Sequence, residues 1–290
     1  MHVDDLLPRC TFPPPGTPVV CALSGGADST ALTALAVHAG CDTTAVHVDH
    51  GLRPGDDDER CAARTAAALG IELGIERVAV DDGPNLEARA RAARYAVLPP
   101  GVLTGHTSDD QAETVLLALL RGSGAAGLSA MTPGPTRPLL AVRRAETRAL
   151  CRTLGLPFVD DPTNAEPRFR RNRVRHELIP LLADIAERDP VPLLDRTATL
   201  LRDDDRLLEE LAATIDPTDA DALDRAHPAL AGRAVRRWLS VDGYPPDADA
   251  VRRVLDVAAG RAEACEITGG RRVSRRNRRL RVCQDGGTSR

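Results

Sequence analysis

The sequence predicts an α/β protein in which a parallel, twisted sheet with helices on both faces is followed by a smaller, mainly helical C-terminal domain. Two observations support this prediction. Short β-like segments alternate with helical patterns over residues 18–120, and such alternation implies right-handed crossovers and parallel strands covered by helices. Beyond residues 189–192 the pattern becomes largely helical.

The expected strands are short apolar segments, and each is followed by a segment of helical length and pattern. Strands are expected at residues 18–23, 43–48, 71–80 and 101–107, and helices at residues 28–38, 57–69, 85–98 and 109–120. Unusual polar residues follow the strands: the turn at Ser24, the pair Asp49 and His50, and residues 104–110. Ligands of parallel α/β sheets bind at the carboxyl ends of the strands, so we expect the site there.

The rest of the chain is expected to hold a long loop and a second domain. Residues 121–138 are rich in glycine, proline and serine, which is typical of a loop. Helices are expected at 145–154 and 173–188, and a proline-containing stretch then separates a domain of residues 1–188 from a domain of residues 189–290. The second domain is expected to be helical to about residue 259 and to end in a basic, strand-like segment.

Charge narrows the functional class. The formal net charge is −4 and the chain contains no lysine, so all 38 basic residues are arginine; residues 168–175 hold five of them and residues 271–281 hold seven. Basic clusters on a mildly acidic chain fit a protein that presents one face to phosphates. A solvated helix face and an exposed tail are the alternative interpretation.

Cysteine usage and hydropathy bear on location. The seven cysteines include no C-x-x-C pair, which is typical of reduced thiols in a cytoplasmic protein. No apolar run approaches the ~18 residues of a membrane-spanning helix, and no signal segment opens the chain. We therefore expect a cytoplasmic protein without a membrane partner.

The turn after the first expected strand reads SGGADS. Gly25 and Gly26 allow the backbone to approach an anion closely, so that N–H groups and the helix N-terminus face it. Ser24 and Ser29 add hydroxyl donors, whereas Asp28 repels a phosphate unless a divalent cation lies between them. The turn therefore predicts a magnesium–pyrophosphate site without lysine; a Gly-Gly turn with a capped helix is the alternative.

This turn resembles the PP-loop signature of the N-type ATP pyrophosphatases, which cleave ATP to AMP and pyrophosphate. Further segments resemble the tRNA(Ile)-lysidine synthases of that superfamily: HVDHGLRPGDDDE, EARARAARYAVL, TGHTSDDQAETVLLALLRGSGAAGL, RPLL and DDPTN…RNRVRHELIPLL. The resemblance covers residues 18–185 in order, and the segments that begin at Thr104 and Arg171 are far more specific than the turn itself. Later residues match only loosely.

The resemblance implies a carbon–nitrogen ligase that uses ATP to adenylate the wobble cytidine in the CAU anticodon of tRNA(Ile), after which free L-lysine displaces AMP. It implies Mg²⁺ as a cofactor, held by Asp28, and leaves a homodimer open. The implied ATP-binding residues are Ser24, Gly25, Gly26, Ala27, Asp28, Ser29 and His106. The implied catalytic residues are Asp28, Asp49, His50 and Arg94, and the implied tRNA-binding residues are Arg121, Asn172, Arg173 and Arg175.

A cationic substrate needs carboxylates. Asp110 and Glu113 lie three residues apart at the start of an expected helix, and therefore on one face; by resemblance they are the lysine-binding pair. Acidic residues that complement the helix dipole are the alternative interpretation. An ammonium cannot attack, so a nearby group must first take its proton. Asp49, His50 and His106 are candidates, with His50 as a polar core residue the alternative.

The remaining residues are expected to handle phosphates and the base. Arg94 is expected to neutralise charge on the leaving pyrophosphate. Asn172, Arg173 and Arg175 are expected to close over the nucleotide or to bind the tRNA backbone. Arg121 and the glycine-rich loop are expected to admit the cytidine, which must leave its stack to react.

Two other functions are compatible with the same fold. A tRNA-thiolation enzyme of this superfamily is the second hypothesis, and the absence of a C-x-x-C pair counts against it. A nucleotide-binding module without catalytic activity is the third, and such a module has no need of the carboxylate pair Asp110 and Glu113.

Overall fold

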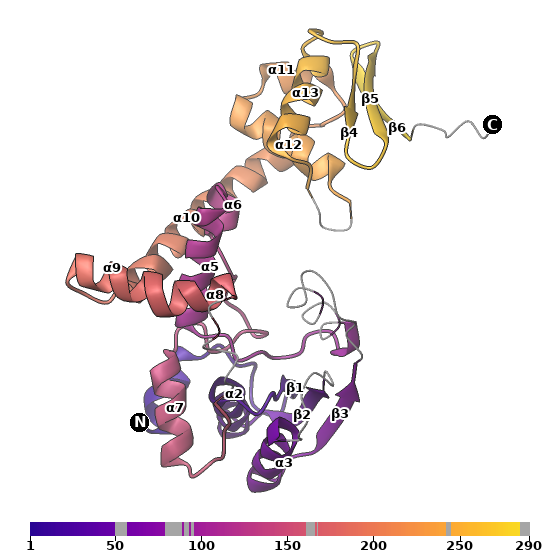
Figure 1. The fold of residues 1–290 in the computed structure, drawn as a ribbon. Helices are drawn as coiled ribbons and strands as arrows, with labels where there is room; N and C mark the ends of the chain where they lie inside the picture. Colours follow the sequence, from indigo (N-terminus) through magenta and orange to yellow (C-terminus); the bar gives the residue numbers. More distant parts are fainter. Residues whose placement is uncertain are drawn as a thin grey trace. The chain divides into compact units, whose positions relative to one another are not determined.

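The computed structural model describes residues 1–49, 57–78, 89, 93, 96–160, 166, 168–241 and 245–284. These residues form two compact units, residues 1–200 and residues 201–290 (Figure 1), and each unit is described by itself. The domain boundary expected between residues 188 and 189 stays a prediction.

The first unit is built on a parallel sheet with the strand order β1 (Pro18–Ala22), β2 (Asp42–Asp49) and β3 (Leu73–Arg77). Cys21 pairs with Ala45 across the first two strands. The predicted α/β fold with a parallel sheet is therefore confirmed. The fourth expected strand is reduced to one parallel bridge between Leu103 and Cys21, because the Ser24 N–H, which would be the next donor of the ladder, donates to Ser29 Oγ instead.

The two faces of this sheet are packed differently. On one face, Val19 and Cys21 pack into a core with helices α2 (Ala27–His38) and α7 (Arg144–Thr153), and Ala45 packs against α3 (Asp57–Leu69). On the other face, alternate residues of β1 and β2 pack against Leu98 and Val102. The helix expected at residues 85–98 falls largely outside the described residues.

Helices after the sheet carry most of the remaining polar candidates. Helix α5 (Ser108–Leu120) agrees with its predicted range, and the short helix α6 (Ala125–Leu128) interrupts the expected loop. The helix expected from residue 173 begins three residues earlier, as α8 (Arg170–Arg173), and continues through the π-helical turn η3 (Val174–Leu178) into α9 (Ile179–Ala186). The N-terminal elements are α1 (Val3–Leu6) and η1 (Leu7–Arg9), and α10 (Val191–Ala213) runs from the first unit into the second.

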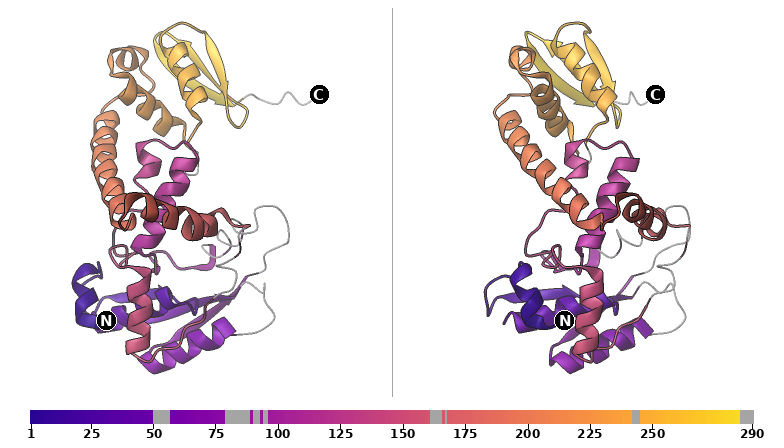
Figure 2. Two further views of the ribbon diagram at one scale, coloured as in Figure 1. Left: turned by 60° about the vertical axis from the view of Figure 1, so that its left-hand side comes forward. Right: turned by 90° about the vertical axis from the view of Figure 1, so that its left-hand side faces the viewer.

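The second unit is helical and ends in a small sheet. Its helices are α11 (Ala220–Arg225), α12 (Pro228–Leu239) and α13 (Ala248–Ala258). Its antiparallel strands are β4 (Ala264–Ile267), β5 (Arg271–Arg276) and β6 (Arg279–Gln284), in that order. Strands β4 and β5 lie against α13 (Figure 2), and Val254 and Val273 are fully buried between them. The mainly helical second unit with a basic β segment is confirmed.

Within the described residues, no helix is both long enough and apolar enough to cross a bilayer.

Replacing Gly105 with alanine tests how tightly the end of the sheet packs on α2. A Cβ atom at this position would lie 2.8 Å from the carbonyl carbon and oxygen of Asp28. We expect the variant to lose about 1–3 kcal/mol of unfolding free energy, because two backbones must separate. Gly134→Ala is the control, since its Cβ would meet nothing within 4 Å. Equal urea midpoints for both variants would contradict this expectation.

Candidate functional site

The predicted nucleotide turn lies between β1 and α2. Gly25 has a φ of 85°, and a Cβ there would lie 2.7 Å from the carbonyl oxygen of Asp58, so only glycine fits. The Ser24 N–H donates to Ser29 Oγ at 3.1 Å, and the Ser29 hydroxyl donates to the Gly26 carbonyl at 2.9 Å. The two serines therefore fix the shape of the turn from within.

Neighbouring segments hold the carbonyl groups of this turn. The Val159 N–H donates to the Gly25 carbonyl at 2.9 Å, and the Cys61 thiol reaches the same oxygen at 3.4 Å. The Cys151 thiol donates to the Ala27 carbonyl at 3.4 Å. Sequence analysis missed both cysteines, which support the turn from α3 and α7.

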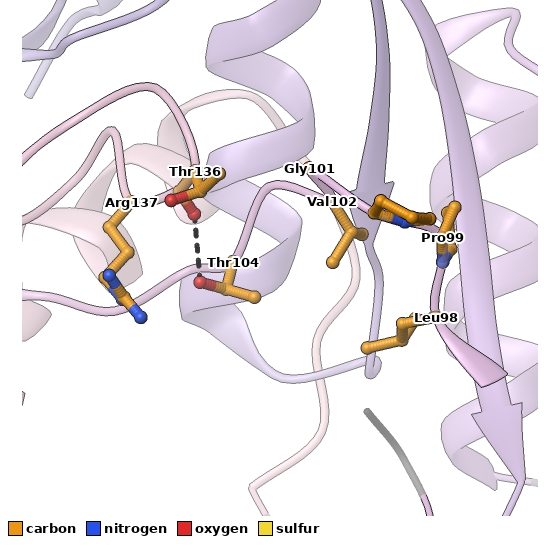
Figure 3. Close-up of a pocket in the computed structure, with 8 residues that line it drawn as sticks. Leu98, Pro99, Gly101, Val102, Thr104, Thr136 and Arg137 are labelled. Carbon is orange, nitrogen blue, oxygen red and sulfur yellow. Dashed lines mark hydrogen bonds between the residues drawn. The ribbon is translucent and has the colours of Figure 1, made fainter. Parts of the chain in front are cut away.

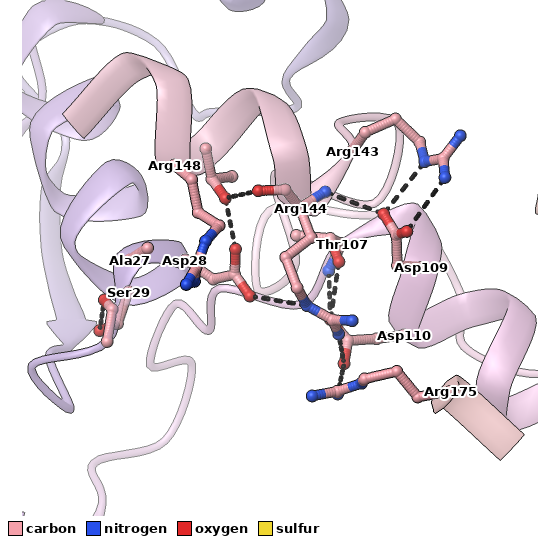
Figure 4. Close-up of polar contacts among 12 residues, drawn as sticks. Ala27, Asp28, Ser29, Thr107, Asp109, Asp110, Arg143, Arg144, Arg148 and Arg175 are labelled. Atoms are coloured by element: carbon pink, nitrogen blue, oxygen red, sulfur yellow. Dashed lines mark hydrogen bonds and ion pairs between the residues drawn. The ribbon is translucent and has the colours of Figure 1, made fainter. Parts of the chain in front are cut away.

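Asp28, the expected metal ligand, lies in the first turn of α2 and points toward α7 (Figure 4). The Thr147 hydroxyl donates to Asp28 Oδ1, and Arg144 Nε lies 3.4 Å from Asp28 Oδ2. Burial raises the pKa of Asp28 above its ordinary value, and Arg144 and Thr147 offset this only in part. The carboxylate is therefore incompletely compensated.

A magnesium ion fits this carboxylate. Among the described residues, no group of three or more His, Cys, Asp or Glu side chains is arranged to hold a metal. Mg²⁺ commonly binds through one or two carboxylates together with substrate phosphates and water. Asp28 supplies one such carboxylate beside a turn suited to phosphates, and an added cation would compensate its buried charge.

Asp110 lies in the first turn of α5, where it also caps the helix. Its Oδ2 accepts the Thr107 N–H at 2.9 Å and the Thr107 hydroxyl at 2.8 Å. Its Oδ1 accepts Arg144 Nη2 at 2.9 Å and Arg171 Nη2 at 3.1 Å. The residue therefore has both a helix-capping role and an ionic one.

Glu113, one turn further along α5, is fully buried and contacts three arginines. It accepts hydrogen bonds from Arg144 Nη1 at 3.0 Å, Arg171 Nε at 2.6 Å and Arg175 Nε at 2.7 Å. We call the six side chains of this network the central cluster: Asp28, Asp110, Glu113, Arg144, Arg171 and Arg175. Its three carboxylates and three guanidinium groups balance in charge.

The N-terminus of α7 is fixed on the N-terminus of α5 by Asp109. Asp109 accepts the backbone N–H of Arg144 at 2.8 Å and the guanidinium of Arg143 at 3.1 Å. Burial opposes ionisation of Asp109, but these hydrogen bonds lower its pKa below the ordinary value. This contact sets the position from which Arg144 reaches the central cluster.

Acid should weaken the central cluster through Asp110. Burial acts to raise the pKa of Asp110, but Arg144 and Arg171 hold it at about 2, below its ordinary value of 3.8. A lowered folded-state pKa contributes stability above the unfolded value, and this contribution is lost as the pH falls from about 4 to about 2. We expect Asp110→Asn to remove about 2 kcal/mol of this pH dependence, measured by urea unfolding across that range. Parallel pH profiles for the two proteins would contradict it.

The other predicted residues are distributed as follows. Asp49 ends β2, with its Oδ2 3.7 Å from Arg77 Nε, and the His106 ring lies 2.8 Å from the Thr104 hydroxyl. Asn172 is buried and donates to the Glu166 carbonyl at 3.0 Å. His50 and Arg94 lie outside the described residues.

The three arginines predicted to bind tRNA differ in their surroundings. Arg175 turns into the central cluster. Arg173 is exposed and pairs with Glu177 on the next turn at 2.8 Å. Arg121 is exposed at the C-terminal end of α5. Arg144 and Arg171, which the sequence analysis did not select, are both in the cluster.

A hollow of about 340 Å³ lies at the sheet edge where the glycine-rich loop meets Thr104 (Figure 3). The Thr104 hydroxyl donates to the Thr136 carbonyl at 3.1 Å across it. Its lining residues are Leu98, Pro99, Pro100, Gly101, Val102, Thr104, Thr136 and Arg137. It shares none of its lining with the central cluster.

Comparison with known proteins identifies the family of the chain. The family model of the PP-loop domain matches residues 7–182. The tRNA(Ile)-lysidine synthase of Nocardia farcinica is 46% identical over 87% of this chain and 85% of its own length. The same enzyme of Rhodococcus erythropolis is 46% identical over 82% of this chain and 78% of its own, and that of Mycobacterium tuberculosis is 43% identical over 76% and 74%.

A solved structure shares the fold. The U34-tRNA thiolase NcsA from Methanococcus maripaludis superposes with a TM-score of 0.54 and 18% identity, over 69% of this chain and 78% of its own. At this low identity, the superposition shows a common fold and nothing further. With the domain match and the relatives above, the chain belongs to the tRNA(Ile)-lysidine synthase family of PP-loop proteins.

Proposed function

We propose that this protein is a ligase that uses ATP to join free L-lysine to the wobble cytidine in the CAU anticodon of tRNA(Ile). The observation that carries the proposal is the central cluster. In it, Arg144 connects Asp28, beside the nucleotide turn, to Asp110 and Glu113. The carboxylate proposed to serve the nucleotide and the carboxylate pair proposed to bind lysine thus lie in one network, which suits an enzyme that uses ATP and lysine in successive steps.

The first step is adenylation of the base. The ring carbonyl oxygen of the cytidine attacks the α-phosphorus of ATP, the bond to the β-phosphate breaks, and pyrophosphate leaves. Backbone N–H groups at the N-terminus of α2 bind the phosphates, while the two serines hold the shape of the turn. Asp28 would hold Mg²⁺, which supplies charge neutralisation on the phosphates.

The second step forms the new carbon–nitrogen bond. The ε-amine of lysine attacks the activated ring carbon, the carbon–oxygen bond to the adenylate breaks, and AMP leaves with the oxygen. Asp110 and Glu113 bind the ammonium group of the substrate, and the attacking amine gives up its proton to a base. Asp49 and His106 are the candidates for this base among the described residues.

The remaining proposed contacts are between exposed arginines and the tRNA. Arg121 and Arg173 are exposed and are proposed to contact tRNA phosphates, which would make binding depend on salt. A cytoplasmic location follows from a tRNA substrate, and a homodimer stays a prediction. The thiolation alternative gains no support from the four buried cysteines, Cys21, Cys41, Cys61 and Cys151, because burial raises the pKa of each of these thiols.

One assay tests the proposal. Protein, ATP, Mg²⁺ and labelled L-lysine are mixed with unmodified tRNA that carries a CAU anticodon. We expect label in the tRNA and AMP in equal amount. AMP formation that proceeds equally without lysine, or label that enters a tRNA with another anticodon equally well, would overturn the proposal.

A further inference from the structure

The carboxylates proposed to bind lysine, Asp110 and Glu113, already have all their acceptor positions occupied in this structure. Glu113 accepts four hydrogen bonds, from Arg144 and Arg171 once each and from Arg175 twice. Asp110 also accepts four, from Arg144, Arg171 and two Thr107 groups. A carboxylate offers about four acceptor positions. An arriving ammonium group therefore finds no acceptor position open.

Charge leads to the same conclusion. Three carboxylates face three guanidinium groups in the central cluster, whose side chains are at most 26% exposed. Adding a cation to a neutral, poorly solvated cluster is unfavourable, because its lost hydration is not replaced. For lysine to bind Asp110 and Glu113, one arginine must first turn elsewhere.

Arg144 is the arginine best placed to turn away from Asp110 and Glu113. Arg171 and Arg175 contact carboxylates of α5, whereas Arg144 also lies against Asp28 at 3.4 Å, beside the nucleotide turn. Mg·ATP brings net negative charge to that turn, and guanidinium groups bind phosphate oxygens strongly. The arriving nucleotide thus provides Arg144 with a new partner.

We infer that Arg144 is a positioning residue that couples the two substrate sites. Nucleotide binding draws its guanidinium toward the phosphates, which releases acceptor positions on Asp110 and Glu113 for the ammonium group of lysine. The inference rests on the proposed function and deepens it: lysine binds well only after the nucleotide. Because coupling is reciprocal, lysine tightens nucleotide binding by the same factor.

Calorimetry on the full-length protein measures this coupling. L-Lysine is titrated with Mg²⁺ alone and then with Mg²⁺ and saturating α,β-methylene-ATP, which cannot be cleaved at the reacting bond. We expect lysine affinity to rise at least about 10-fold with the nucleotide analogue, within the range typical of coupled sites. Equal lysine affinity under the two conditions would overturn the inference.

Substitution of Arg144 separates coupling from a structural role. In Arg144→Gln we expect lysine to bind more tightly than in the wild type without nucleotide, and the coupling to fall below about twofold. A merely structural arginine would give weaker lysine binding instead. Arg144→Lys keeps the charge and should retain part of the coupling, which keeps the test usable if the glutamine variant fails to fold.

Arg148→Gln is the matched control, one turn along α7. Arg148 pairs with the exposed Asp160 and packs over Phe158, outside the central cluster. It should keep wild-type coupling, and loss of coupling in this variant would contradict the inference.

The labelling assay distinguishes a failure of the coupling between the two sites from a failure of the proposed function. If labelled lysine enters the tRNA but binds independently of nucleotide, the inference is wrong and the proposed function stands. If no label enters the tRNA, the proposed function is wrong, whatever the coupling.

Discussion

Glu113→Gln should raise the KM for lysine at least about 100-fold, the effect typical of breaking a buried, hydrogen-bonded charge pair. The substitution keeps the shape of the side chain and removes its charge. Arg144, Arg171 and Arg175 then face one another with too little compensating charge. Steady-state labelling of tRNA at varied lysine concentration measures the effect.

The same substitution should destabilise the fold, and this must be separated from the effect on lysine. An unpaired buried charge typically costs about 3–5 kcal/mol, which urea unfolding would detect. Binding of α,β-methylene-ATP at low temperature shows whether the variant remains folded during the assay. Glu177→Gln is the matched control, because Glu177 pairs with an arginine at the surface and its loss should change little. An unchanged KM in folded Glu113→Gln would exclude Glu113 as a lysine ligand.

The elements near the N-terminus were predictable because their causes are local. The helix expected at residues 57–69 coincides with α3 (Asp57–Leu69), since its alanine-rich pattern and acidic first turn lie within the segment itself. The glycine turn was predictable for the same reason: Gly25 has a positive φ, and glycine adopts it without strain.

Other features depend on contacts between distant segments. Arg144 meets Asp28, Asp110 and Glu113 at separations of 116, 34 and 31 residues. Nothing local distinguishes it from the other arginines in a chain with 38 basic residues. The early start of α8 has a similar cause, because Arg171 is held there by Glu113 and the arginine run carries no apolar periodicity.

The two carboxylates of α5 show where sequence reasoning stops. Their spacing placed Asp110 and Glu113 on one face of a helix, and the structure confirms that they lie together against the same arginines. Spacing cannot reveal which cations already occupy that face. The arginine partners come from α7, α8 and η3, so they follow only from the tertiary fold.

Asp28→Asn should lower the rate of AMP formation about 10²–10³-fold, the loss typical of removing one preorganised electrostatic group. The substitution leaves the turn intact and removes the buried charge proposed to hold Mg²⁺. AMP release is measured with tRNA and lysine present, and analogue binding is measured at varied Mg²⁺. We expect binding to strengthen with Mg²⁺ in the wild type and to be far less dependent on it in the variant.

Asp42→Asn is the matched control for this substitution, because Asp42 is exposed at the opposite, amino end of β2. It should leave both AMP formation and the Mg²⁺ dependence unchanged. Asp28→Asn also removes one carboxylate partner of Arg144, so the variant discriminates between two roles. If AMP formation falls while the Mg²⁺ dependence is unaltered, Asp28 acts by positioning Arg144 and not as a metal ligand. If both fall together, the carboxylate holds the metal, and the burial that raises its pKa is what makes a divalent partner favourable there.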